Sequence, residues 1–299
     1  MIAASIDFGG TKLMLGFVDQ AGQILGQQTF PTPKERGPEG VADFALEKLH
    51  ALGRSRGIEL ERCVGVGSTV PALANTKAGM LLYAPAHGWW DVPFARMLEE
   101  RFHLPARIAN DVNACALAEL RFGLGRQLRN FLWVTVSTGV GSALILEGQL
   151  YEGSGALAGE IGHFVLEPEG YECGCGMRGC VEAIAAGPAI ARRAREMGVQ
   201  AADAREVARL AAQGDPKAKA AIRASEDYLA QAFSYAVNLL DLDAVVLGGG
   251  VSQSLDLAYV ERAMLAKVIM RERRKVRVLP TTLGYSAALV GAASLVLPG

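Results

Sequence analysis

Short apolar runs and stretches of helical hydrophobic spacing alternate along the whole chain. In the first part, the runs are bounded by turn residues and have the length of buried strands. They predict strands at residues 2–6, 11–18, 24–30, 63–67 and 106–109. Apolar positions at helical spacing predict a helix that begins near Pro38 and another at 111–120, since proline is well tolerated in a first helical turn.

The second part of the chain repeats this order of elements. The expected strands are 131–136, 143–146, a short one near 150, 244–247 and 276–279. The expected helices are 182–197, 203–213, 216–240 with Asp215 as its N-cap, and one from 287. Because each part opens with three strands and continues with helices and strands, we expect two similar α/β units with a cleft between them. Their expected bounds are 1–112 with 286–299 for the smaller unit and 113–285 for the larger.

Composition and charge limit the partners of the protein. Thirty Lys and Arg residues against 31 Asp and Glu residues give a formal net charge of −1, which argues against a broad electrostatic grip on nucleic acid or membrane lipid. No signal-peptide pattern is present, and the apolar stretch 287–297 is about half the ~20 residues that span a bilayer. We therefore expect a cytoplasmic protein with reduced thiols, bound to neither nucleic acid nor membrane.

Two glycine-containing turns connect strands at equivalent places in the two parts. The first, Asp7–Lys12, reads Asp-Phe-Gly-Gly-Thr-Lys, and the second, Ser137–Gly139, reads Ser-Thr-Gly. Backbone N–H groups, a threonine hydroxyl and a lysine ammonium suit a phosphate, and Asp7 suits a water-mediated magnesium ion. The first turn taken alone is equally consistent with a plain hairpin. Two such turns at matching positions favour phosphate binding.

The pair Asn110-Asp111 lies where a strand ends and a helix begins. Asn and Asp are favoured helix N-caps, and on this motif alone the cap is the better interpretation. The functional interpretation is a general base that accepts a proton from a hydroxyl attacking a γ-phosphoryl group. Both interpretations hold together if Asn110 is the cap.

One histidine and three cysteines lie within eighteen residues. His163, Cys173, Cys175 and Cys180 have the spacing H-x9-C-x-C-x4-C, with glycines that let the chain wrap tightly. Three thiolates and one imidazole are a usual tetrahedral ligand set for structural zinc. Free reduced thiols or a disulfide are the alternatives, and a reducing compartment disfavours the disulfide.

Two glutamates lie close to these residues in the sequence. If zinc binds one nitrogen of His163, the other nitrogen and Glu160 can present a polar pair to a substrate hydroxyl. Glu182, two residues past Cys180, can join them, although on the sequence alone a favourable first-turn acid of a helix is the better interpretation. The run Gly248–Gly250 after a strand allows close packing against adenine, and its plain interpretation is a strand–helix turn.

Together these motifs resemble the ROK family (repressor, open reading frame, kinase) of bacterial sugar kinases, glucokinase-like members of the actin/hexokinase/heat-shock ATPase superfamily. The most specific part of the resemblance is Gly159–His163 joined to the cysteine loop Cys173–Cys180. It implies two ribonuclease H-like domains, each a mixed sheet flanked by helices, with an interdomain cleft. It also implies an ATP-dependent kinase for a hexose hydroxyl, by default the 6-OH of glucose, which uses ATP, Mg²⁺ and a structural Zn²⁺ and forms a homodimer or homotetramer.

The resemblance also implies residue roles, with Asp111 as the catalytic base. Sugar hydroxyls would be bound by Asn110, Asp111, Glu160, His163 and Glu182. Zinc would be bound by His163, Cys173, Cys175 and Cys180. The nucleotide and its magnesium would be bound by Asp7, Gly9, Gly10, Thr11, Lys12, Thr138, Gly139, Gly248, Gly249 and Gly250.

Departures from the family pattern leave the sugar open. Where the family usually reads Pro-Gly-Pro, this chain has Thr69-Val70-Pro71, and Ala86 lies in a stretch that often carries an asparagine; Ser137 replaces a common glycine. A kinase for an N-acetylhexosamine or fructose is therefore an alternative. A sugar-sensing regulator of the same family is a further one, disfavoured by the neutral charge and by a first strand expected at Ile2, ahead of which a helix-turn-helix would have to lie.

Overall fold

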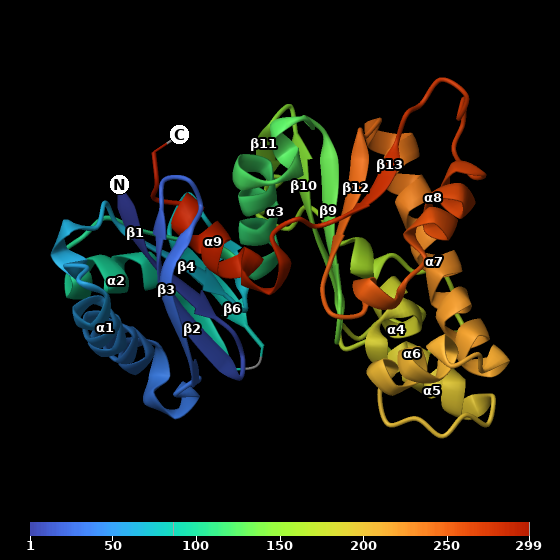
Figure 1. Cartoon of the computed structure of the whole chain (residues 1–299), viewed down its shortest axis with the longest axis horizontal. Coiled ribbons are helices and arrows are strands. Elements are labelled where there is room, and N and C mark those ends of the chain that lie inside the picture. Colours follow the sequence, from blue (N-terminus) through green and yellow to red (C-terminus); the bar gives the residue numbers. More distant parts are fainter. Residues whose placement is uncertain (86, 299) are drawn as a thin grey trace. The chain divides into compact units, whose positions relative to one another are not determined.

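The chain folds into two compact units in a computed structural model that describes residues 1–85 and 87–298. One unit comprises Met1–Arg126, Glu152–Ala158 and Thr282–Gly299, and the other Gln127–Tyr151 and Gly159–Thr281. The expected boundary at 112/113 differs because helix α3 (Asp111–Phe122) packs along α9 (Ala287–Ser294) and so belongs to the first unit (Figure 1). The expected cleft stays a prediction.

The first unit is built on a five-stranded mixed sheet. Its strands are β1 (Ile2–Phe8), β2 (Lys12–Asp19), β3 (Ile24–Pro31), β4 (Val66–Val70) and β8 (Ala106–Asn110). Their order is β3-β2-β1-β4-β8, with β1, β4 and β8 parallel and the β1–β2–β3 meander antiparallel. Strand β4 begins three residues later than expected because Leu60–Arg62 form a 3-10 turn that Cys63 closes with an N–H bond to the Leu60 carbonyl.

Alternation along β1 decides which helices cover which face of this sheet. Ala4, Ile6 and Phe8 lie in the core shared with α1 (Gly37–Arg56) and α2 (Phe94–Phe102), whereas Ala3 packs with residues of the α9 segment. Helices α1 and α2 therefore lie on one face and α9 on the other (Figure 1). A small antiparallel sheet of β5 (Leu73–Asn75), β6 (Met80–Ala84) and β7 (Trp89–Val92) has no counterpart in the sequence-based expectations.

The second unit repeats the strand order of the first. Its strands are β9 (Phe131–Val136), β10 (Val140–Leu146), β11 (Gln149–Tyr151), β12 (Ala244–Gly248) and β13 (Arg277–Pro280). Their order is β11-β10-β9-β12-β13, again an antiparallel meander beside parallel central strands. The same topology twice confirms the expected pair of mixed α/β sheets.

Helices gather on one face of the second sheet. They are α4 (Val181–Ala185), α5 (Gly187–Glu196), α6 (Ala204–Ala212), α7 (Pro216–Leu240) and α8 (Leu257–Leu265). The bounds of α7 and its Asp215 cap confirm the expectation, because the Asp215 side chain accepts from two first-turn N–H groups. The single helix expected at 182–197 is wrong: it breaks at Ala186, where the backbone is extended and Pro188 follows with no N–H to continue the helix.

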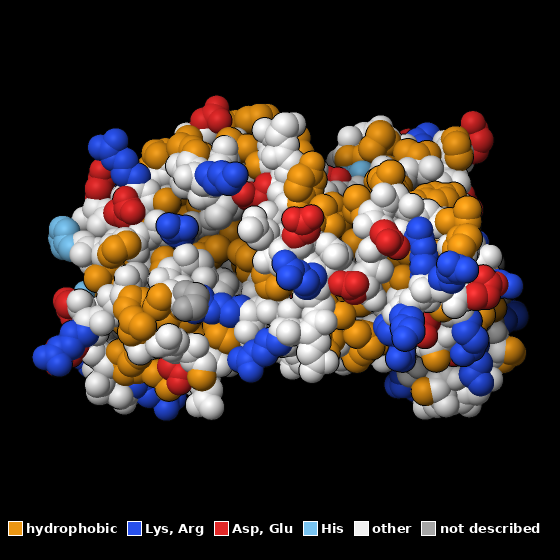
Figure 2. Space-filling model, turned by 90° about the horizontal axis from the view of Figure 1, so that it is seen from above, with side chains coloured by type: hydrophobic (Ala, Val, Ile, Leu, Met, Phe, Trp, Pro, Cys, Tyr) orange, Lys and Arg blue, Asp and Glu red, His pale blue; other side chains and the backbone are white. Residues whose placement is uncertain are grey.

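The surface agrees with the balanced composition. Figure 2 shows Lys and Arg side chains interspersed with Asp and Glu side chains over the face it presents. Within residues 1–85 and 87–298, no helix combines the length and apolar character needed to cross a bilayer.

Candidate functional site

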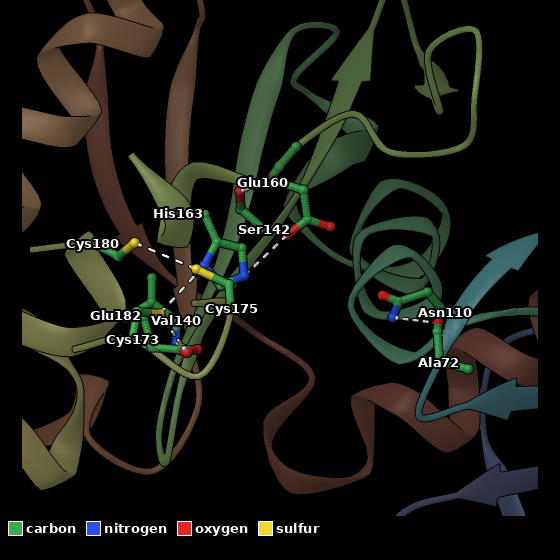
Figure 3. A network of polar contacts seen from close by, with 11 residues as sticks. Ala72, Asn110, Val140, Ser142, Glu160, His163, Cys173, Cys175, Cys180 and Glu182 are labelled. Atoms are coloured by element: carbon green, nitrogen blue, oxygen red, sulfur yellow. Dashed lines mark hydrogen bonds and ion pairs between the residues drawn. The ribbon is translucent and has the colours of Figure 1, made fainter. Parts of the chain in front are cut away.

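At the strand–helix junction of the first unit, one residue caps the helix and the next presents a carboxylate. Asn110 Oδ1 accepts hydrogen bonds from the Val112 N–H (2.9 Å) and the Asn113 N–H (3.4 Å), and its Nδ2 donates to the Ala72 carbonyl at 3.1 Å (Figure 3). Asn110 is thus the N-cap of α3, as its sequence position allowed. Asp111, the first residue of the helix, accepts a hydrogen bond from the Val112 N–H on Oδ1 at 3.0 Å.

Asp111 lies in an environment that favours its neutral form. Burial, and next the negative charge of Asp7, raise its pKa from an ordinary 3.8 to about 6, although the Val112 N–H opposes the change. The helix N-terminus and Asn110 also favour the ionised form but do not cancel the effect of burial. The carboxylate is therefore ionised at neutral pH and readily accepts a proton.

Asp7 is held at the end of β1 by a residue of the neighbouring parallel strand. Thr69 Oγ1 donates to Asp7 Oδ1 at 2.8 Å and accepts from the Phe8 N–H at 3.1 Å. Burial raises the pKa of Asp7, and the Thr69 hydrogen bond opposes the rise. Sequence reasoning noted Thr69 only as a departure from a family pattern. The signal for its role lies in the pairing of β1 with β4, which no local pattern reveals.

The first glycine-containing turn connects β1 and β2. The Gly9 N–H donates to the Lys12 carbonyl at 2.9 Å, so the turn closes on itself. Thr32, which lies outside the turn, stabilises it through two hydrogen bonds. Its hydroxyl donates to the Gly9 carbonyl at 2.8 Å, and its N–H donates to the Thr11 carbonyl at 3.1 Å. Gly9 and Gly10 are half-buried, whereas Thr11 and Lys12 are exposed, which leaves the hydroxyl and the ammonium accessible to a ligand.

In the second unit, the cysteine loop brings together all four expected metal-binding side chains. The donor atoms of His163, Cys173, Cys175 and Cys180 lie within 4.8 Å of one another (Figure 3). Cys175 Sγ and Cys180 Sγ are 3.7 Å apart, and Cys173 Sγ is 3.7 Å from His163 Nδ1. Tetrahedral zinc with bonds of about 2.3 Å places two sulfurs about 3.8 Å apart. Donor chemistry and spacing thus fit a structural zinc ion, and all five cysteines, each in the described part, are free thiols.

Two acidic side chains flank this cluster. Glu160 Oε2 lies 3.9 Å from His163 Nε2, the nitrogen opposite to the one near Cys173 (Figure 3). Both side chains are partly exposed to solvent. Burial raises the pKa of Glu160, and His163 opposes the rise. Glu182 is in the first turn of α4, but its carboxylate does more than favour the helix: Oε2 accepts from the Val140 N–H at 3.1 Å.

A cavity of about 460 Å³ opens beside the second glycine-containing turn. It is lined by residues from the turn, α5, the α6 N-terminus and the loop after β12, including Ser137, Thr138, Gly187, Arg205, Gly250 and Val251. Sequence reasoning missed the contribution of α5 and α6, which comes from residues distant in the chain. Of the glycine run, Gly250 lines this cavity; Gly249 has a φ of +88° and a Cβ there would lie 2.4 Å from the Val136 carbonyl oxygen, so this position requires glycine.

The sequence profile of the ROK family matches residues 3–298. This match covers nearly the whole chain. The chain belongs to the ROK family.

Individual known proteins are similar to this chain over nearly its full length. An N-acetylmannosamine kinase of Yersinia pestis is 36% identical over 97% of this chain and 96% of its own. The structure of a ROK hexokinase from Thermus thermophilus is 34% identical with a TM-score of 0.83, and covers 99% of this chain and 98% of its own. A ROK glucokinase from Streptomyces griseus, in complex with glucose and AMPPNP, is 30% identical with a TM-score of 0.81, and both chains are covered completely.

Two of the three departures from the ROK pattern lie within the described residues. Val70 is fully buried and belongs to the core cluster of the first unit, so its side chain does not face solvent. Ala86 lies outside the described residues. The substitution at Ser137 is accommodated at the cavity, which this residue lines.

Proposed function

We propose that this chain, an ATP-dependent sugar kinase of the ROK family, uses Asp111 as the general base that activates a hexose hydroxyl. The observation that supports this role most directly is a carboxylate with a pKa of about 6 at the start of α3, relieved of capping by Asn110. As the hydroxyl oxygen attacks the γ-phosphorus of ATP, its proton passes to a carboxylate oxygen of Asp111 and ADP leaves.

Sugar recognition is assigned to the polar groups near the cysteine cluster and to Asn110. With Nδ1 of His163 directed at the thiols, Nε2 and the Glu160 carboxylate are available to sugar hydroxyls. When bound, Zn²⁺ holds the three thiolates together and fixes the orientation of the His163 ring. Glu182 and Asn110 complete the proposed set.

Nucleotide binding is assigned to the two glycine-containing turns and the cavity beside the second. The N–H groups and hydroxyls of Gly9–Lys12 and Thr138-Gly139 suit phosphate oxygens, and the Lys12 ammonium adds positive charge. Asp7, held by Thr69, suits a magnesium ion through water. The cavity lined by Gly250 suits the adenosine part, and Gly248 and Gly249, which pack against β9, belong to the same proposed adenosine loop.

The sugar is proposed to be glucose, and N-acetylmannosamine is the second candidate. The second is favoured by the 36% identity to an N-acetylmannosamine kinase, which exceeds the 30% identity to a glucokinase of known structure. A coupled assay of ADP release over a panel of hexoses and N-acetylhexosamines tests both. We expect the highest kcat/KM with glucose; a preference for N-acetylmannosamine would replace the first candidate with the second. The homodimer or homotetramer implied by the resemblance stays a prediction.

A further inference from the structure

Val140 is held on both sides of its backbone by residues close to His163, Cys173, Cys175 and Cys180, which together form the cysteine–histidine site. It is buried, begins β10 and directly follows the turn Ser137–Gly139. Its N–H donates to Glu182 Oε2 at 3.1 Å (Figure 3). Its carbonyl oxygen lies so close to Gly162 that a Cβ there would approach it to 1.9 Å. The backbone of Val140 therefore has little freedom to move.

Both groups that hold Val140 are joined to metal-binding residues. Gly162 precedes His163 in the 3-10 turn Ile161–His163. Glu182 follows Cys180 by two residues, and its Oε1 lies 3.6 Å from Cys173 Sγ. The two halves of the cysteine–histidine site, separate in the sequence, thus meet at the start of β10.

The turn before Val140 transmits this constraint because it is short and closed. The Ser137 N–H donates to the Gly139 carbonyl at 2.9 Å, and the Ser137 carbonyl accepts from the Gly187 N–H at 2.8 Å. A Cβ on Gly139 would lie 2.4 Å from Glu182 Oε2, so the carboxylate packs directly against the turn. Glu182 therefore contacts the turn directly beside Thr138.

We propose that Glu182 is a positioning residue through which the cysteine–histidine site holds the Ser137–Gly139 turn in its nucleotide-binding conformation. This inference rests on the proposed role of that turn in binding phosphate. It extends the role of Glu182 beyond sugar binding, because it makes nucleotide affinity depend on Glu182 and on the metal when no sugar is present. A residue that contacts only the sugar has no such effect.

The test is the dissociation constant of AMPPNP with Mg²⁺, measured by calorimetry on the full zinc-loaded chain without sugar. Glu182→Ala removes the acceptor of the Val140 N–H, and we expect binding about tenfold weaker or more. Glu182→Gln keeps a side-chain carbonyl that can accept this N–H, so we expect affinity close to that of the parent protein. Glu172→Ala is the matched control, because Glu172 directly precedes the cysteine loop but is exposed and paired with Arg178.

Hydrogen exchange gives a readout that does not depend on activity. The Val140 amide is expected to exchange faster in Glu182→Ala and at the parent rate in Glu182→Gln. Should Glu182→Ala fail to fold, the same AMPPNP titration on parent protein stripped of zinc, with folding checked by circular dichroism, replaces it; weaker binding supports the inference and unchanged binding refutes it.

A further variant separates failure of the inference from failure of the proposed function. If Thr138→Val binds AMPPNP as tightly as the parent, the hydroxyl contact proposed for this turn fails, and with it the contact that Glu182 would position. If Thr138→Val weakens binding but Glu182→Ala does not, only the positioning role is overturned. Equal weakening by Glu182→Ala and Glu182→Gln would also overturn it, since the charge and not the Val140 hydrogen bond would then be responsible.

Discussion

Replacing Asp111 by asparagine should abolish most of the activity and stabilise the fold at the same time. The side chain keeps an oxygen that can accept the Val112 N–H, but it no longer ionises inside the protein. The pKa of Asp111 is about 6 in the folded chain against an ordinary 3.8. At 1.36 kcal/mol for each pKa unit, this difference makes the ionised form of Asp111 less favourable in the folded chain by up to about 3 kcal/mol. Because Asp111 is half-buried and keeps contact with solvent, we expect its contribution to the free energy of unfolding to be about 1–3 kcal/mol.

The pH dependence of this gain has a definite sign. Below pH 3.8 the carboxyl is protonated in both the folded and unfolded chains, so the substitution changes little. Between 3.8 and about 6 the folded chain retains a proton that the unfolded chain has released, and the parent protein loses stability as the pH rises. Above pH 6 the full difference is present. Asp111→Asn, neutral throughout, should therefore exceed the parent in stability at pH 8 and match it near pH 4.

Urea unfolding at both pH values and steady-state kinetics at pH 8 measure the two effects. We expect kcat to fall by about 10²–10⁴-fold, the usual contribution of a general base. Asp91→Asn, an exposed substitution on β7 in the same unit, is the control and should alter neither quantity. An Asp111→Asn protein that is no more stable than the parent at pH 8, or that keeps a tenth of the parent kcat, would refute the reasoning.

Three further predictions follow from the same geometry. In the parent enzyme, kcat/KM should decline below about pH 6 with a slope of one proton as Asp111 becomes protonated, and a profile flat to pH 5 would contradict the base role. Thr69→Val should lower the free energy of unfolding in urea by about 1–3 kcal/mol because it leaves the Phe8 N–H without its acceptor, whereas Thr69→Ser should not. Cys175→Ala should bring the zinc content, measured by elemental analysis, well below one per chain, and undiminished zinc would show that this thiol is not a ligand.

The parts of the fold that could be predicted are those with strong local signals. Strand β9 has the expected bounds because it is a continuous apolar run, and α7 because Asp215 and Pro216 mark its start. The break in the helix expected at 182–197 was missed although Pro188 is a local signal, because the apolar spacing continues through it. The boundary at 112/113 was wrong because the packing of α3 on α9 joins segments more than 160 residues apart.

The residues of the candidate site likewise differ in how far a local sequence pattern predicts them. The four metal-binding side chains could be predicted because three of them lie within eight residues and the glycines between them signal a tight loop. The contacts of Glu182 with Val140 and of Thr69 with Asp7 span 42 and 62 residues, and neither side chain belongs to a pattern that points to its partner. Sequence spacing identifies groups able to bind a metal or phosphate. The hydrogen bonds that hold those groups in position arise when separate strands and helices pack, so the coupling between the metal site and the phosphate-binding turn can be found only in the folded chain.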